Sequence, residues 1–456
     1  ELIEVLTGIR KPDRMSLFLN GALFGGNARA FLSAGIGHVP EDRMVRGLIL
    51  DMSVEQNLLL GHHTNREYQN RGWFHWKQVR NYSTAIIQDY QIKAPTPQEK
   101  VSCLSGGNQQ KTVIARVFSH KSDVIIIAQP TRGVDIGASS IDLCITDYSG
   151  KKLHRYSEAA SVKDGPIKVL GRVCTLIEKM LKEKNLSADK LNGIGIGVPG
   201  PVDFSSGTLI SPPIMPGWDR YPIIDTVQQW FPMANVVVDN DVNVMALGES
   251  YKGAGKGIDN MIYVKIGTGI GAGILSEGKI YRGSNGCAGD IGHIGVNKSG
   301  PLCHCGNKGC LEAVAAGPAI AEHALQAALS GKSPILLKKY ERNGNRLSAE
   351  DVGEAAREGD PFAIEVIRES GTSIGDVLAG LVNFYNPSMI VIGGGISNLG
   401  NLLLSSIRQS VLNRSLPLAT KDLAIVFSSI GPDAGVVGAV NLAMNYIFTQ
   451  ISGKGD

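Results

Sequence analysis

The stretch M-I-Y-V-K-I-G-T-G-I-G-A-G, residues 261–273, decides the fold that we expect, because an apolar strand runs directly into a glycine-rich loop. Glycines let backbone amides approach a phosphate closely, and a threonine adds a hydroxyl group. The pattern therefore predicts phosphate contacts from Gly267, Thr268, Gly269 and Gly271. A generic hairpin turn is the alternative, since a short glycine repeat is a weak signal by itself.

A histidine and three cysteines downstream have the spacing of a metal site. His293, Cys303, Cys305 and Cys310 give the pattern H-x9-C-x-C-x4-C. One imidazole and three thiolates complete a tetrahedral Zn²⁺ site with no open position, so we expect a structural zinc. His304, between two ligands, is the less favoured donor. Free thiols are the alternative, and the crowded C-x-C spacing disfavours a disulfide.

Composition indicates a globular protein. The 456 residues suffice for two to four domains, and 43% hydrophobic against 19% charged residues allows a buried core. A net charge of +3 is too small to indicate nucleic acid or an anionic membrane as partner. We find neither an apolar run of the ~20 residues that a membrane span needs nor a signal peptide. The odd count of seven cysteines argues against a secreted disulfide scaffold, so we expect a cytoplasmic protein.

Alternating apolar strands and helices indicate the α/β class. We expect strands at residues 124–127, 236–238, 261–264 and 389–392, and helices at residues 167–184, 315–329, 361–385 and 435–447.

Several further motifs follow one another from Gly133 to about Ile447. They are G-V-D-I-G-A-S-S at residues 133–140, G-I-G-V-P-G-P-V-D at 195–203, N-D-V-N at 240–243, G-D-I-G-H at 289–293, G-C-L-E at 309–312 and I-V-I-G-G-G-I at 390–396. With the glycine loop, they resemble the ROK family (repressor, open reading frame, kinase). The resemblance implies an actin-like (RNase H-like) fold with two lobes, at residues 133–256 and 257–456, whose last helix returns to the first lobe.

The resemblance also implies a glucokinase-like reaction, the phosphorylation of a hexose or N-acetylhexosamine by ATP and Mg²⁺. Asp241 would be the general base that accepts the proton of the sugar hydroxyl. Capping of the next helix is the alternative role for this aspartate. The implied sugar contacts are Asn240, Asp241, Asp290, His293 and Glu312, and the implied nucleotide contacts, beside the glycine loop, are Asp135, Gly137, Ser139, Gly393, Gly394 and Gly395.

Two departures from the family pattern keep a second function open. Asp290 replaces the usual glutamate, a form associated with ROK-type repressors. Residues 137–140, G-A-S-S, stand where the family usually has G-G-T-K. A sugar sensor or transcriptional regulator that does not phosphorylate is therefore the competing hypothesis, although we find no helix-turn-helix that would bind DNA.

The chain before residue 133 contains motifs of a different kind. L-S-G-G-N-Q-Q-K at residues 104–111 resembles the signature motif of ABC importer ATPases of the sugar and nucleoside type, with Ser105 at a helix N-terminus. The phosphate loop G-x-x-x-x-G-K-[ST] is absent from the sequence. Ala128 and Gln129 stand where an aspartate for Mg²⁺ and a glutamate are usual. We therefore expect residues 1–132 to be a truncated P-loop ATPase segment without activity of its own.

Two expectations concern the junction and the partners. The hexapeptide at residues 133–138 fits both an ABC ATPase and a ROK kinase, and we assign Asp135 to the kinase. Residues 1–132 are expected to be either a passive appendage or a remnant that associates with a membrane transporter. The resemblance implies a small sugar as substrate and a homo-oligomer, dimer or tetramer, with no insertion into a membrane.

Overall fold

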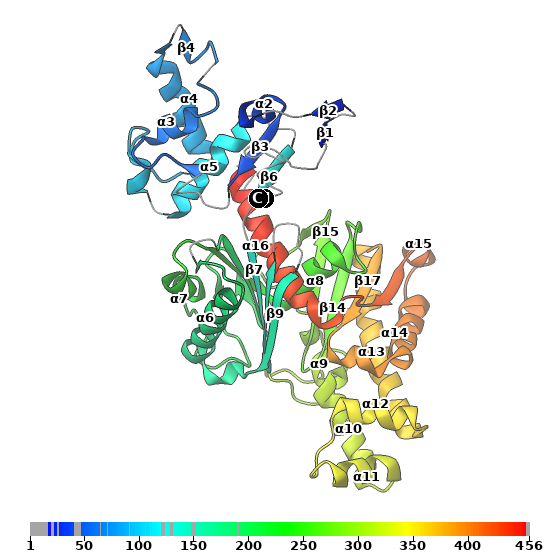
Figure 1. The fold of residues 1–456 in the computed structure, drawn as a ribbon. Coiled ribbons are helices and arrows are strands. Elements are labelled where there is room, and N and C mark those ends of the chain that lie inside the picture. The colour runs from blue at the N-terminus through cyan, green and yellow to red at the C-terminus, as the bar shows by residue number, and fades with distance from the viewer. Residues whose placement is uncertain are drawn as a thin grey trace.

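The computed structural model describes residues 17–19, 22–24, 27–40, 47–63, 65–70, 72–90, 92–104, 106–119, 124–127, 131–146, 152–188 and 191–452. Within these ranges a smaller N-terminal region adjoins a larger body with two lobes (Figure 1). Ser105, Ala128 and Gln129, three residues on which the sequence expectations depend, lie outside the described residues. No described helix is long and apolar enough to cross a membrane.

The first lobe contains a five-stranded sheet in the order β13–β10–β7–β8–β9. Its strands are β7 (Thr131–Ile136), β8 (Ser140–Thr146), β9 (Lys152–Ala159), β10 (Gly193–Val198) and β13 (Asn235–Asn240). β7, β8 and β9 are antiparallel neighbours, whereas β10 and β13 join in parallel. The apolar faces of α6 (Pro166–Glu183) and α7 (Ile223–Trp230) pack on this sheet and form the core of the lobe.

The second lobe repeats this plan in the order β16–β15–β14–β17–β18. Its strands are β14 (Met261–Ile266), β15 (Ile270–Ser276), β16 (Lys279–Ile280), β17 (Met389–Gly393) and β18 (Ala424–Phe427). Three antiparallel strands are again followed by two parallel ones, so the lobes are topological copies. Helices α9 (Leu311–Ala315), α10 (Gly317–Leu329), α13 (Pro361–Tyr385) and α14 (Asn401–Arg414) cover one face.

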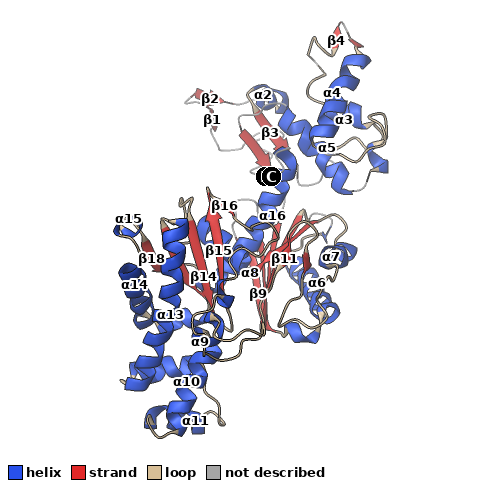
Figure 2. Cartoon of the chain, turned by 180° about the vertical axis from the view of Figure 1, so that it is seen from behind, coloured by secondary structure: helices blue, strands red, loops and turns tan. Residues whose placement is uncertain are grey.

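Two helices, α8 (Asp241–Lys252) and α16 (Ala434–Ser452), lie between the sheets (Figure 2). Val244 of α8 packs with α16 and the first sheet, whereas Val242 packs with the second sheet. Glycines allow close contact here, because a Cβ atom at Gly248 or Gly438 would overlap the backbone of the facing helix. The start of α8 is therefore held rigidly between the lobes.

The N-terminal region consists of short sheets and helices. β3 (Ile36–Val39) and β6 (Val124–Ile127) pair in parallel, and α3 (Val54–Leu59), α4 (Trp76–Asp89) and α5 (Gly106–Ser119) lie beside them. Ile447 of α16 is part of this region's apolar core, so one helix connects the region to the body. The remaining elements are β1 (Leu17–Leu19), β2 (Ala22–Phe24), α2 (Ala28–Ser33), β4 (Gln69–Asn70), β5 (Trp73–Phe74), β11 (Val202–Asp203), β12 (Thr208–Leu209), α11 (Pro334–Arg342), α12 (Ala349–Arg357), α15 (Pro417–Thr420) and five described 3₁₀ turns.

The expected strands fall within β6, β13, β14 and β17, and three of the four expected helices correspond to α6, α13 and α16. The fourth, residues 315–329, corresponds to α10 and differs from it only at the start, where Ala315 ends α9 and Ala316 caps α10. The two helices are separate because the first turn of α10 contains Pro318, which has no amide hydrogen to continue the preceding helix. The shared hexapeptide at the junction places Asp135 on β7, inside the first sheet.

Candidate functional site

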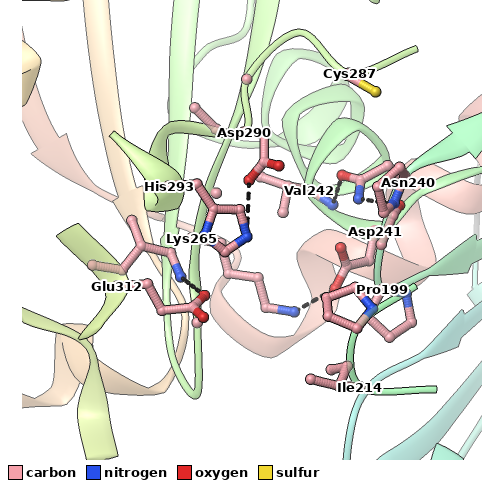
Figure 3. Close-up of a pocket in the computed structure, with 18 of the residues that line it drawn as sticks. Pro199, Ile214, Asn240, Asp241, Val242, Lys265, Cys287, Asp290, His293 and Glu312 are labelled. Carbon is pink, nitrogen blue, oxygen red and sulfur yellow. Dashed lines mark hydrogen bonds and ion pairs between the residues drawn. The ribbon is translucent and has the colours of Figure 1, made fainter. Parts of the chain in front are cut away.

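A cavity of about 370 Å³ opens between the lobes at the start of α8, a size that suits a small molecule. The turn after β10, the hairpin between β14 and β15, and the loop at residues 286–293 supply most of its wall. The predicted site residues on this wall are Asn240, Asp241, Thr268, Gly269, Gly271, Asp290, His293, Cys305 and Glu312. Figure 3 shows several of them around the opening.

Asp241 is the first residue of α8, and Asn240 caps that helix. The Asn240 Oδ1 atom accepts hydrogen bonds from the amides of Val242 at 2.9 Å and Asn243 at 3.3 Å. Its Nδ2 atom donates to the carbonyl of Gly200 at 2.9 Å. The capping alternative for Asp241 is therefore wrong, and the Asp241 carboxylate is available for another partner.

That partner is Lys265, on β14 of the opposite lobe. Lys265 Nζ donates to Asp241 Oδ2 at 2.5 Å, and the side chains are 24% and 4% exposed (Figure 3). Burial lowers the pKa of Lys265, but the neighbouring carboxylates of Asp241 and Asp135 outweigh it, so the pKa is raised. Sequence reasoning missed this lysine, although its charge inside the apolar stretch M-I-Y-V-K-I was a visible signal.

Asp135 lies behind the cavity wall, near the same ion pair. Its side chain is buried and its Oδ1 atom has no hydrogen-bond partner. Burial raises the pKa of Asp135 to about 7, which Lys265 opposes and Asp241 reinforces. A Cβ atom at Gly197 would lie 3.3 Å from Asp135 Oδ1 and 3.5 Å from Asp241 Cα, so both residues pack around this glycine. A buried carboxylate oxygen without a partner suits a hard divalent cation such as Mg²⁺.

Glu312, Asp290 and His293 line the second-lobe side of the cavity. Glu312 Oε2 accepts a hydrogen bond from the amide of Ile270 at 3.2 Å and so supports the glycine loop. His293 Nε2 lies 4.0 Å from Asp290 Oδ1, and the Asp290 side chain is half exposed. These groups present carboxylate and imidazole acceptors and donors to whatever occupies the cavity.

His293 also belongs to the predicted metal set. One ligand atom each from His293, Cys303, Cys305 and Cys310 lies within 4.8 Å of all the others. His293 Nδ1 is the atom that faces this cluster, 3.5 Å from Cys303 Sγ. A hydrogen bond from the backbone of Asn307 lowers the pKa of Cys305 to about 7, which favours the thiolate that a metal needs. The four side chains could therefore hold a metal ion at the edge of the cavity.

Of the predicted glycine turns, the one between β14 and β15 lines the cavity and the one after β17 does not. Gly267 to Gly271 form the hairpin between β14 and β15, so the hairpin alternative describes their local structure, and this hairpin also lines the cavity. Gly393 ends β17 next to Lys265 of β14, and Gly394 takes a φ of +85° where a Cβ atom would overlap the carbonyl of Ile266. The predicted residues absent from the cavity wall are Asp135, Gly137, Ser139, Gly267, Gly393, Gly394, Gly395, Cys303 and Cys310.

Comparison with known proteins gives the two parts of the chain different relatives. The ROK family model matches residues 131–446, and the ABC transporter family model matches residues 1–132. The glucokinase of Halalkalibacterium halodurans is 36% identical over 307 residues, which make up 67% of this chain and 92% of that protein. The xylose repressor of Caldicellulosiruptor bescii is 32% identical over 315 residues, 69% of this chain and 77% of the repressor.

A solved structure agrees with these relatives. The crystal structure of a ROK family glucokinase from Streptomyces griseus, in complex with glucose and AMPPNP, is 33% identical and has a TM-score of 0.61. The match covers 69% of this chain and 99% of that one. The actin-like fold is thereby confirmed, as is the ABC transporter segment before it. The motifs, the duplicated sheets and the matched residues lead to one conclusion: this chain belongs to the ROK family.

Proposed function

We propose that the two-lobed body binds a hexose or an N-acetylhexosamine in the cavity and phosphorylates it with MgATP. The observation that carries the proposal is the position of Asp241, whose buried carboxylate lies where both lobes line the cavity. Phosphoryl transfer needs a carboxylate that accepts the proton of the attacking sugar hydroxyl. A glucokinase among the relatives supports the same reaction class.

The surrounding residues take defined roles in this proposal. Glu312, Asp290 and His293 orient the sugar hydroxyls, and Asn240 fixes Asp241 by capping α8. Asp135 would hold Mg²⁺, because its buried Oδ1 atom has no hydrogen-bond partner and its carboxyl group interacts electrostatically with that of Asp241. When bound, MgATP supplies the phosphoryl group, and the glycine turns after β7, β14 and β17 offer backbone amides to its phosphates.

We further propose that His293, Cys303, Cys305 and Cys310 bind a structural Zn²⁺. Coordination through Nδ1 would fix the His293 ring and leave Nε2 for Asp290 or a sugar oxygen. The Cys305→Ser protein should lose zinc and unfold at a lower temperature, whereas Cys103→Ser, an exposed cysteine of the N-terminal region, should change neither. Metal analysis by mass spectrometry checks both, and unchanged zinc in the Cys305 variant would refute this ligand set.

A second candidate function is sugar sensing without phosphorylation. It is favoured by the ion pair that Lys265 makes with Asp241, because an ammonium group already holds one oxygen of the carboxylate that the kinase would use as its base. The shorter Asp290 and the xylose repressor among the relatives point the same way.

The deciding experiment measures ADP release from MgATP with a panel of hexoses and N-acetylhexosamines. Release that depends on one sugar and disappears in the Asp241→Ala protein would establish the kinase and name its substrate. Binding of a sugar by calorimetry, with no ADP release from any member of the panel, would overturn the kinase proposal in favour of the sensor.

A further inference from the structure

Lys265 introduces a positive charge between the lobes that none of the roles proposed for the kinase uses. The lysine lies on β14 of the second lobe, whereas Asp135 on β7 and Asp241 on α8 belong to the first. The ion pair to Asp241 therefore crosses from one lobe to the other (Figure 3). Because Asp241 and Asp135 are both buried, each would be costly to hold as a bare anion, and the ammonium group compensates them.

We propose that Lys265 is an internal counter-cation for the carboxylates of Asp135 and Asp241, and that a divalent cation entering this site must displace its ammonium group from Asp241. The inference rests on the proposed function only in placing the divalent cation of the nucleotide at Asp135. It goes further, because it states that Lys265 controls how tightly that cation binds.

Charge and geometry both support this competition. When both carboxyl groups are ionised, the two carboxylates and one ammonium leave a single net negative charge, whereas the two carboxylates alone would match the charge of a divalent cation. Asp135 Oδ1 has no hydrogen-bond partner, so it retains a free lone pair for a metal. Asp241 Oδ2, in contrast, is already occupied by Lys265 Nζ at 2.5 Å. Ammonium and metal would therefore compete for the same pair of anions, and at close range their repulsion is strong.

Occupation of Asp241 also bears on catalysis. A carboxylate oxygen that accepts a hydrogen bond from an ammonium group has one lone pair fewer for a sugar hydroxyl. Displacement of Lys265 by the metal would free the carboxylate at the moment when the nucleotide is in place. Lys265 is in this sense a positioning residue, since it acts through Asp241.

The test is calorimetric titration of the full chain with MnCl₂ in the absence of nucleotide, after loading with zinc and removal of free metal. Native protein is compared with Lys265→Met, which keeps the length of the side chain without its charge, and with Lys265→Arg, which keeps the charge. We expect the Met variant to bind Mn²⁺ about 10-fold or more tightly than native protein. The Arg variant should bind it as weakly as native protein does. Adding Asp135→Asn to the Met variant should abolish the gain.

Equal or weaker Mn²⁺ binding by the Met variant would overturn the proposal, as would a gain of equal size in the Arg variant. If the Met variant does not fold, Lys265→Gln provides the same loss of charge with a polar side chain, and the same criteria apply.

The ADP-release assay keeps the two proposals separate. The Met variant should reach half-maximal release at a lower Mg²⁺ concentration than native protein. If no variant releases ADP with any sugar while Mn²⁺ binding tightens as expected, the kinase proposal fails and the counter-cation stands. If native protein phosphorylates a sugar and Lys265→Met leaves both the Mn²⁺ affinity and the Mg²⁺ dependence unchanged, the kinase stands and the counter-cation fails.

Discussion

The two-lobed body and the N-terminal region differ in the size of their β-sheets. The body contains two five-stranded sheets with one shared strand order, each covered by its own helices. The described part of the N-terminal region has only two-stranded sheets, and its main apolar core is built largely from α3, α5 and the segments beside them. Ile447 from the body completes that core.

The difference shows that a recognisable motif and a self-sufficient fold are separate properties. The segment at residues 104–111 matches an ABC transporter and begins a real helix, α5. Its region nevertheless takes a core residue from a helix of the ROK family body. We therefore expect function to reside in the body and the N-terminal region to depend on it for stability. Four predictions test this division, from the largest effect to the smallest.

The first concerns catalysis. Asp241→Ala should lower kcat for sugar phosphorylation by ~10²–10⁴-fold and leave sugar binding largely intact, because the general base acts only in the transition state. The matched change in the other region is Asn108→Ala, in the signature motif, where Asn108 Oδ1 accepts a hydrogen bond from the amide of Lys93. Its kcat should equal that of native protein. A comparable fall in both variants would show that the regions share the active site.

The second concerns the helix that joins the regions. Ile447→Ala should cost about 2–5 kcal/mol, because it removes buried methyl groups from the core of the N-terminal region. Hydrogen exchange should accelerate in α5 while β14 of the second lobe keeps its protection. The exposed Ile167 of α6 is the control, and Ile167→Ala should leave exchange unchanged. Equal loss of protection in α5 and β14 would mean that the two regions unfold together.

The third examines how the body holds this helix. A Cβ atom at Gly195 would overlap the carbonyl of Ala439 on α16, so Gly195→Ala should cost about 1–3 kcal/mol in the body. Gly171, inside α6, has open space around it. Gly171→Ala should therefore stabilise the body by roughly 0.5–1 kcal/mol. Denaturant unfolding measures both, and a neutral Gly195 variant would contradict the close packing of α16 on the first sheet.

The fourth prediction, with the smallest effect, compares the same helix-capping motif in the two regions. Ser53 in the N-terminal region and Ser348 in the body each begin a helix with a reciprocal capping box. Replacing either serine by alanine should cost about 1 kcal/mol. Ser53→Ala should speed exchange in α3 alone, and Ser348→Ala in α12 alone. Any effect of the Ser53 change on α12 would argue that stability is shared across the whole chain.

Sequence reasoning was strongest where residues lie close together along the chain. The four predicted metal ligands lie between residues 293 and 310, and their ligand atoms are within 4.8 Å of one another. The expected strands within β13, β14 and β17 also formed, because apolar runs that end at glycine or polar turns specify buried strands locally. Their assembly into two copies of one sheet was not visible, since pairing partners far apart in the chain leave no periodic signal.

The site shows the same limit. Asp241 was identified from its motif, but its bond to Lys265 joins residues 24 positions apart on different elements. Only the packing of β14 against α8 brings the two charges together. The alternative role for Asp241, capping of the helix, belongs to its neighbour, because Asn240 and Asp241 are both good caps and the backbone decides which one precedes the first turn. The metal and sugar-binding roles of these residues stay predictions.

The position of α16 has a consequence for the order in which the chain folds as it leaves the ribosome. Strands β7 and β10 are made early, but the helix that covers them begins at Ala434, after the whole second lobe has been synthesised. One apolar face of the first sheet therefore stays exposed until α16 has been synthesised. The core of the N-terminal region also stays incomplete until then, because it includes Ile447 of α16. Such a nascent chain would be a natural client for chaperones that shield apolar surface until the final helix arrives.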